Sequence, residues 1–276
     1  MITVPSLEWH LSHACNLSCE GCIHLSDYTH NTVINIDILE TWYLKWHTRI
    51  IPETICLSGG EPLLNKKILD ILYMTREYWP NTKSIELTTN GFLLNRYPDL
   101  PKVLEKTQIG ISISVHDRSK IYNEKVFEMK NILKEWSKSY KFYYNIVNDW
   151  EKGWNKIFPI VNNNIEPHAD NNPESSWNLC PANQNCWQLF EGNIYKCPPL
   201  AYLNMHKEKY GLSKSWDPYL SYIPLTPDAS DNEIKDFFNR KSENVCSMCS
   251  TKPRQLYEPK LDPIKRKTVK LISLKN

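Results

Sequence analysis

Short apolar runs typical of buried strands alternate along residues 6–147 with longer segments whose apolar residues recur at helical spacing. The segment 35–50 is an example, because Leu39, Trp42 and Trp46 fall on one helical face. The pattern predicts strands at 6–12, 54–60, 84–91, 109–115 and 141–147, and helices at 35–50, 65–79, 95–106 and 119–138. A further strand at 154–161 would complete a sixth unit, although Pro159 weakens it.

This repeated strand–helix order predicts right-handed crossovers and a parallel sheet covered by helices. Five or six units are too few for a closed eight-stranded barrel. We therefore expect an α/β fold whose main part is a partial (β/α)6 TIM-like barrel. In such folds the chemistry lies at the carboxyl ends of the strands, where the chain continues as a cysteine loop, "SGGEP", "TTNG" and "VHD".

The pattern changes near residue 162, where a polar stretch rich in Asn and Pro begins. Beyond it the elements are short, with a hairpin expected around Glu191–Gly192–Asn193 and a helix at 231–242. We expect two domains: a core at 1–165, and a small α+β domain with a basic tail at 166–276.

Nine cysteines without a secretory signal favour metal or redox chemistry over a disulfide framework. No apolar run is long enough to span a membrane, so a cytoplasmic location is predicted. The net charge of +2 predicts no polyanionic partner by itself. Residues 252–276 are strongly basic, which we interpret mainly as a solvated end, with nucleic acid unlikely but not excluded as a partner.

Cys15, Cys19 and Cys22 lie in one short loop directly after the first predicted strand. A closed zinc site needs four ligands, and a redox pair of Cys19 and Cys22 would leave Cys15 unexplained. Three thiolates suit a [4Fe–4S] cluster in which one iron stays open for an exogenous ligand.

The motif Cys15-x3-Cys19-x2-Cys22, with "SGGEP" at Ser58–Pro62, resembles the radical S-adenosylmethionine (SAM) superfamily. The resemblance covers residues 7–150. It implies a [4Fe–4S] cluster on the three cysteines, SAM on its open iron, and a 5′-deoxyadenosyl radical that removes a hydrogen atom from substrate. The SAM-binding turn would be Gly59, Gly60, Glu61 and Pro62, with carbonyls and Glu61 accepting hydrogen bonds from the SAM ammonium. Gly21 departs from the aromatic residue that many members place before the third cysteine.

Other candidate site residues lie at or just after the ends of the predicted strands. By the same resemblance, Thr88, Asn90 and Ser114 are expected to contact SAM or substrate. The candidate catalytic residues are His116, His24 and Tyr28, although a lone histidine is more often structural. Cys56, between Ile55 and Leu57, is expected to be a buried small residue.

A second set of cysteines follows residue 180. The spacing Cys180-x11-Gly192-x4-Cys197, followed by Cys246-x2-Cys249, resembles the shorter, twitch-like form of the SPASM/twitch domain. The resemblance implies an auxiliary [4Fe–4S] cluster on Cys180, Cys197, Cys246 and Cys249. A four-cysteine zinc site matches the same ligand count. The four-ligand count does not need Cys186, which we interpret as a structural thiol or as an alternate ligand in place of Cys180.

A fully ligated auxiliary cluster is better suited to electron relay than to binding substrate. We therefore favour oxidation or rearrangement of a polar small molecule, with an electron-donor protein such as a flavodoxin or ferredoxin as partner. Peptide maturation is the first alternative; it is disfavoured because the first strand begins within about seven residues, without room for a leader-binding domain. Nucleic-acid or nucleotide modification comes next. A non-catalytic iron–sulfur or zinc module would not need the glycine turn.

Overall fold

The structure is a computed structural model that describes residues 1–17, 19, 22–26, 32–117, 119–148, 158–161, 164–168, 171–180, 183 and 185–252. The candidate Tyr28, the departure at Gly21 and nearly all of the basic tail lie outside the described residues.

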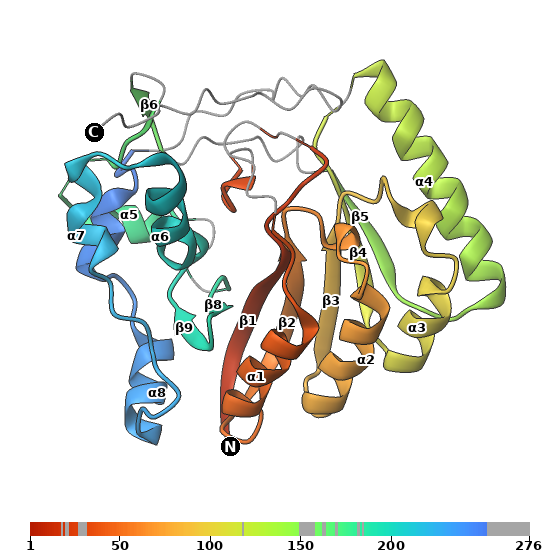
Figure 1. Cartoon of the computed structure of the whole chain (residues 1–276), viewed down its shortest axis with the longest axis horizontal. Coiled ribbons are helices and arrows are strands. Elements are labelled where there is room, and N and C mark those ends of the chain that lie inside the picture. Colours follow the sequence, from red (N-terminus) through yellow and green to blue (C-terminus); the bar gives the residue numbers. More distant parts are fainter. Residues whose placement is uncertain are drawn as a thin grey trace.

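Seven strands form one sheet in the order β5-β4-β3-β2-β1-β8-β9 (Figure 1). The first five strands all run parallel to their neighbours. They are β1 (Ile2–Ser12), β2 (Ile50–Gly59), β3 (Ser84–Thr89), β4 (Gly110–Val115) and β5 (Tyr144–Asn148). The five strands that the pattern predicts between residues 6 and 147 are therefore confirmed.

Four helices connect these strands: α1 (Ile36–Trp46), α2 (Ile68–Tyr78), α3 (Leu100–Thr107) and α4 (Lys120–Ser139). Two of them begin at side-chain caps, since Asn35 accepts from the amides of Asp37 and Ile38, and Ser119 accepts from that of Tyr122. Short 3-10 turns precede α2 and α3, η2 (Pro62–Leu64) and η3 (Leu94–Arg96). The predicted alternation of strands and helices is therefore confirmed, and the element boundaries lie close to the predicted ones.

The two faces of β1 differ in chemistry. Leu7, Trp9 and Leu11 are fully buried and point to the helices, where the Trp9 ring meets Tyr43 of α1 edge-on at 5.3 Å between centroids. The alternate residues Ser6, Glu8, His10 and Ser12 are polar and also buried. Since strand side chains alternate between faces, the helices cover an apolar face, and polar groups line the opposite, inner face of the sheet.

The described part of the strand predicted at 154–161 does not extend this sheet. Residues 154–157 lie outside the described residues, and β6 (Ile160–Val161) pairs antiparallel with β7 (Asn164–Ile165) in a separate two-stranded sheet. Within the described part of the chain, five parallel strands come from the repeat, so a sixth unit in line with them is not found. β6 and β7 are only two residues long and Pro159 precedes β6, so they form too few backbone hydrogen bonds to continue a parallel sheet.

Strands from the C-terminal part of the chain instead extend the sheet beyond β1. β8 (Gln188–Phe190) pairs parallel with β1, with Gln188 opposite Glu8, and β9 (Asn193–Tyr195) returns antiparallel to β8. The connecting residues Glu191 and Gly192 both have positive φ, 51° and 77°, as a tight two-residue hairpin requires. The predicted hairpin is confirmed, and it is part of the main sheet.

The remaining elements lie on the β1 side of the molecule (Figure 1). They are α5 (Pro173–Asn178), α6 (Pro198–Tyr210), η5 (Lys214–Trp216), α7 (Asp217–Leu220), α8 (Asp231–Asn239) and η6 (Asn244–Met248). The helix predicted at 231–242 is α8, and it starts at a capping box formed by Ser230 and Glu233. A second apolar cluster, which includes the fully buried Trp216, packs α6, η5, α7 and η6 together, whereas the buried apolar residues of α8 join the main core. No helix in the described part of the chain has the length and apolar character needed to cross a membrane.

Trp46 joins the N-terminal helices to this C-terminal hairpin. Its indole Nε1 donates to the carbonyl oxygen of Gly192 at 2.9 Å, and the side chain is fully buried. We expect Trp46→Phe to lower the free energy of unfolding by about 1–3 kcal/mol, because the carbonyl loses a buried donor. Denaturant unfolding measures this loss. The control Leu44→Ala, on the same helix but 55% exposed, should change stability by no more than about 0.5 kcal/mol; equal effects of the two substitutions would contradict the prediction.

Candidate active site

The loop that carries Cys15, Cys19 and Cys22 (the cysteine loop) and the turn Gly59–Pro62 (the glycine turn) are joined through their backbones. The amide of Gly60 donates to the carbonyl oxygen of Ser12 at 2.7 Å, and that of Glu61 donates to Ala14 at 2.8 Å. Neither glycine has room for a side chain: a Cβ on Gly59 would lie 2.2 Å from the Ser12 oxygen, and one on Gly60 would lie 2.3 Å from the Ala14 oxygen. Gly59 also has a φ of 144°. The two glycines therefore let the turn lie directly against the start of the cysteine loop.

The three cysteines themselves lie in a compact loop. The Cys15 sulfur accepts from the amide of Leu17 at 3.4 Å, and the amide of Cys22 donates to the carbonyl oxygen of Cys19 at 3.2 Å. Cys19 is buried, whereas Cys15 and Cys22 are half-buried. Three thiols in one loop, close to the protein surface and braced by the glycine turn, suit a cluster that keeps one open iron.

Glu61 is committed to contacts inside the protein. One carboxylate oxygen accepts from the Thr89 hydroxyl at 2.6 Å and from the amide of Leu63, and the other accepts from the amide of Asn90 at 2.9 Å. The side chain is fully buried, and burial raises the pKa of Glu61 to about 7 against the lowering effect of these hydrogen bonds. Glu61 thus ties the turn to the end of β3, and its predicted contact with SAM stays a prediction.

The polar residues predicted at the ends of β3 and β4 have different surroundings. Asn90 bridges two parts of the site, because its amide donates to Glu61 and its side-chain nitrogen donates to Asn16 of the cysteine loop at 2.7 Å. Thr88 lies on the inner face with its hydroxyl 3.4 Å from the Cys56 sulfur. Ser114 is half-buried on β4, opposite Val147 of β5.

Of the histidines predicted as catalytic, His24 contacts a buried carboxylate, and His116 lies close enough to His24 to be affected by its charge. His24 Nε2 is 2.9 Å from a carboxylate oxygen of Glu8. His116 is half-buried just beyond β4, and its backbone amide donates to the Tyr122 hydroxyl at 3.1 Å. Burial, with a contribution from the nearby His24, lowers the pKa of His116 to about 4. His116 is therefore a neutral imidazole at physiological pH.

Glu8, His10 and His13 belong to this site although the motifs did not indicate them. His10 Nδ1 lies 3.2 Å from Nδ1 of His13, and the His10 ring stacks on Tyr202 of α6 at 4.1 Å between centroids. Glu8 accepts from the Ser58 hydroxyl at 2.6 Å. The signal that could have found them is the alternation Ser6–Leu7–Glu8–Trp9–His10–Leu11–Ser12, which turns the polar residues to the inner face.

The pKa values of this polar group have opposing causes. Burial alone would raise the pKa of Glu8, but the charge of His24 and hydrogen bonds with His24, Ser58 and Gln188 hold it below its usual value. Burial, together with His24 and His13, holds the pKa of His10 well below the usual range. At neutral pH, Glu8 is thus a carboxylate and His10 a neutral imidazole.

The cysteines of the second set affect one another's pKa values. Burial raises the pKa of the Cys197 thiol, a backbone hydrogen bond from Leu200 opposes this, and Cys249, Cys180 and Cys246 raise it further. These mutual effects place all four thiols in one neighbourhood. The elements that carry them are joined by hydrogen bonds, since the Ser176 hydroxyl of α5 donates to the Cys249 carbonyl oxygen at 2.8 Å.

A buried cation accompanies these thiols. The side chain of Lys196 is 4% exposed, lies 3.0 Å from Glu243 and 4.4 Å from the centre of the Trp177 ring, and helps to lower the pKa of Cys246 against the effect of burial. A buried positive charge favours the thiolate form that metal ligation needs.

Cys186 lies between the two sites. Its pKa is raised by burial and then by Glu8 and Cys180. Cys56, on the inner face of β2 beside Glu8, has its pKa raised by burial, by Glu8 and also by Cys186. Glu8 of the inner face and Cys180 of the second cysteine set therefore both act on the Cys186 thiol.

A model of the Radical SAM superfamily matches residues 9–147, half of the chain. The chain belongs to the radical SAM superfamily, and as an enzyme of that family it uses a [4Fe–4S] cluster and SAM. The matched region contains Cys15, Cys19 and Cys22 and the glycine turn. Their donor set and close bracing fit these cofactors, as the geometry above shows.

Curated relatives include the probable GTP 3′,8-cyclase of Methanocaldococcus jannaschii, 30% identical over 114 residues, which are 40% of this chain and 36% of that protein. The probable GTP 3′,8-cyclase of Pyrococcus abyssi is 26% identical over 142 residues, 51% of this chain and 45% of that protein. The match thus spans less than half of each relative. The solved structure of BtrN in complex with AdoMet and 2-DOIA superposes with a TM-score of 0.54 at 16% identity, over 94% of this chain and 99% of that one. That likeness shows a shared fold.

Proposed function

We propose that this radical SAM enzyme removes a hydrogen atom from a polar small molecule and oxidises or rearranges it with the help of an auxiliary [4Fe–4S] cluster. The observation that supports the proposal is that Cys180, Cys246 and Cys249 all affect the pKa of Cys197, with the buried Lys196 acting on Cys246. When bound, SAM and its cluster supply a 5′-deoxyadenosyl radical, and the auxiliary cluster supplies a one-electron acceptor.

The chain's own residues position the cofactors. Cys15, Cys19 and Cys22 would hold the first cluster, and Asn90 and Glu61 keep their loop against the glycine turn. Because the Glu61 carboxylate is already committed, we assign the contact with the SAM ammonium to backbone carbonyls of the Gly59–Pro62 turn.

The inner face of the sheet would receive the substrate. It is lined by hydroxyls, a carboxylate and imidazoles, including Ser58, Glu8 and His10. Such a surface suits a ligand with hydroxyl or amino groups, because buried polar groups need hydrogen-bond partners. A flavodoxin or ferredoxin is the proposed electron donor.

The auxiliary site is tested by iron content. Reconstituted enzyme should hold about eight irons per chain, and replacing Cys180, Cys197, Cys246 and Cys249 together with Ala should leave about four. This variant should still form 5′-deoxyadenosine from SAM and dithionite, because its first cluster is intact.

The control Cys56→Ala removes a thiol from the inner face and should keep about eight irons. Elemental analysis of the same samples would show zinc in place of the second set of irons if the four cysteines form a structural zinc site, and that result would refute the auxiliary cluster. Cooperative thermal unfolding of each variant shows whether it is folded.

A further inference from the structure

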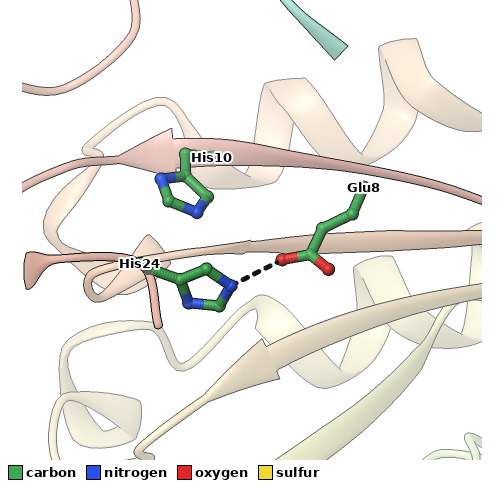
Figure 2. Close-up of side chains that lie close together, drawn as sticks. All are labelled: Glu8, His10 and His24. Atoms are coloured by element: carbon green, nitrogen blue, oxygen red, sulfur yellow. Dashed lines mark ion pairs between the residues drawn. The ribbon is translucent and has the colours of Figure 1, made fainter. Parts of the chain in front are cut away.

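Glu8, His10 and His24 bring three potential metal ligands together on the inner face. Glu8 and His10 are two residues apart on β1 and so share one side of the strand, while His24 reaches them from the loop that follows Cys22. Their ligand atoms all lie within 4.8 Å of one another. Figure 2 shows the three side chains pointing toward a common centre from these two segments.

The groups behind these three residues resemble the support that protein metal sites have. The Glu8 carboxylate accepts from Ser58 at 2.6 Å and is hydrogen-bonded by Gln188, whose own side-chain oxygen accepts from Tyr202 at 2.8 Å. His10 Nδ1 is paired with His13 Nδ1 at 3.2 Å. Ligating carboxylates and imidazoles are characteristically fixed by such bonds from their second atom.

One ring nitrogen of His10, Nε2, makes no hydrogen bond with any residue that the structure describes that would explain its burial. The residue is 3% exposed, and its Nε2 is buried with no hydrogen-bond partner among the described residues. In Figure 2 this nitrogen faces Glu8 and His24. A buried polar atom left unpaired costs about 1–3 kcal/mol, so an ion pair between Glu8 and His24 alone does not account for the arrangement.

We propose that Glu8, His10 and His24 bind one divalent transition-metal ion, in addition to the iron–sulfur clusters. Two imidazoles and one carboxylate are ligands for Zn²⁺ or Fe²⁺, and three protein ligands leave a position open for an oxygen of water or of a polar substrate. The proposal does not depend on what the enzyme does to its substrate.

Zinc binding to the reconstituted holoenzyme tests the site. After equilibrium dialysis against Zn²⁺ and removal of loosely bound metal, the wild-type chain should retain about one zinc while its iron content stays unchanged. His10→Ala and Glu8→Gln should each lose that zinc. His47→Ala, which alters a histidine at the end of α1, should keep it. Gln188→Ala should weaken zinc binding by about 10–100-fold, because it releases the carboxylate.

Two results would overturn the proposal: a wild-type chain that retains no zinc, or His10→Ala and His24→Gln variants that retain as much zinc as the wild type. Loss of iron in step with zinc uptake would mean that zinc enters the cysteine sites, and would also refute it. Iron content and cooperative unfolding show whether each variant is folded; should His10→Ala fail to fold, His24→Gln and Gln188→Ala give the same test. Formation of 5′-deoxyadenosine in these samples reports separately on the radical SAM function.

Discussion

Replacing Cys15, Cys19 and Cys22 together with Ala is expected to abolish formation of 5′-deoxyadenosine from SAM and to lower the iron content from about eight to about four per chain. The variant would have no thiolates left at the position where the glycine turn holds SAM, whereas the four cysteines near Lys196 would be untouched. Anaerobic incubation with SAM and dithionite, followed by chromatography of the nucleoside products, measures the first effect. Iron analysis measures the second.

The variant lacking the second cysteine set is the matched control, since it should lose the same number of irons and still cleave SAM. An unchanged iron content in the variant of the first set would show that these three cysteines hold no cluster. Formation of 5′-deoxyadenosine at the wild-type rate without them would contradict the site itself.

Gly60→Ala is expected to abolish tight SAM binding and to destabilise the fold by about 1–3 kcal/mol, the usual cost of overpacking. The new methyl group would lie 2.3 Å from the Ala14 carbonyl oxygen and 3.0 Å from Cys15 Cβ. Backbone atoms cannot move aside as a side-chain end can, so the cysteine loop must separate from the turn. Isothermal titration of the reconstituted enzyme with SAM measures the binding loss, and denaturant unfolding measures the stability loss.

Gly110→Ala provides the comparison. Its Cβ would lie 3.1 Å from the edge of the Tyr143 ring, which is 64% exposed and free to shift. SAM affinity should remain within about 2-fold of the wild type, since Gly110 begins β4 at the end of the sheet away from the site. Equal SAM affinities of the two alanine variants would contradict the role of Gly60.

Much of the N-terminal half follows from local sequence signals. Apolar runs such as 109–115 and helical stripes such as the one through Trp42 and Trp46 depend on periodicities that a single sequence shows directly. The glycine turn and the cysteine loop could be paired in advance, because the ends of neighbouring parallel strands meet at one edge. The bonds from Gly60 to Ser12 and from Glu61 to Ala14 realise that pairing.

The rest depended on contacts between distant segments. β8 pairs with β1 through residues 188 and 8. A strand of only three residues has no local sequence pattern that predicts a partner so far away in the chain. The hydrogen bonds of Glu61 could not be foreseen for a similar reason, because only the packed sheet brings Thr89 and Asn90 to its carboxylate. Glu8 and His10 were visible as polar positions in an alternating strand, but without Gln188, Tyr202 and His24 nothing distinguished them from a solvated face.

β1 is an interior strand of the sheet, with β2 on one side and β8 on the other, and these partners become available at different times during synthesis. When only the first 150 residues have been synthesised, β1 is an edge strand with unpaired backbone groups, and its buried carboxylate lacks the partner at position 188. Contacts across about 180 residues make closure of the sheet slow relative to formation of the local strand–helix units. We therefore expect the emerging chain to expose this strand edge until β8 has been synthesised and can pair with β1.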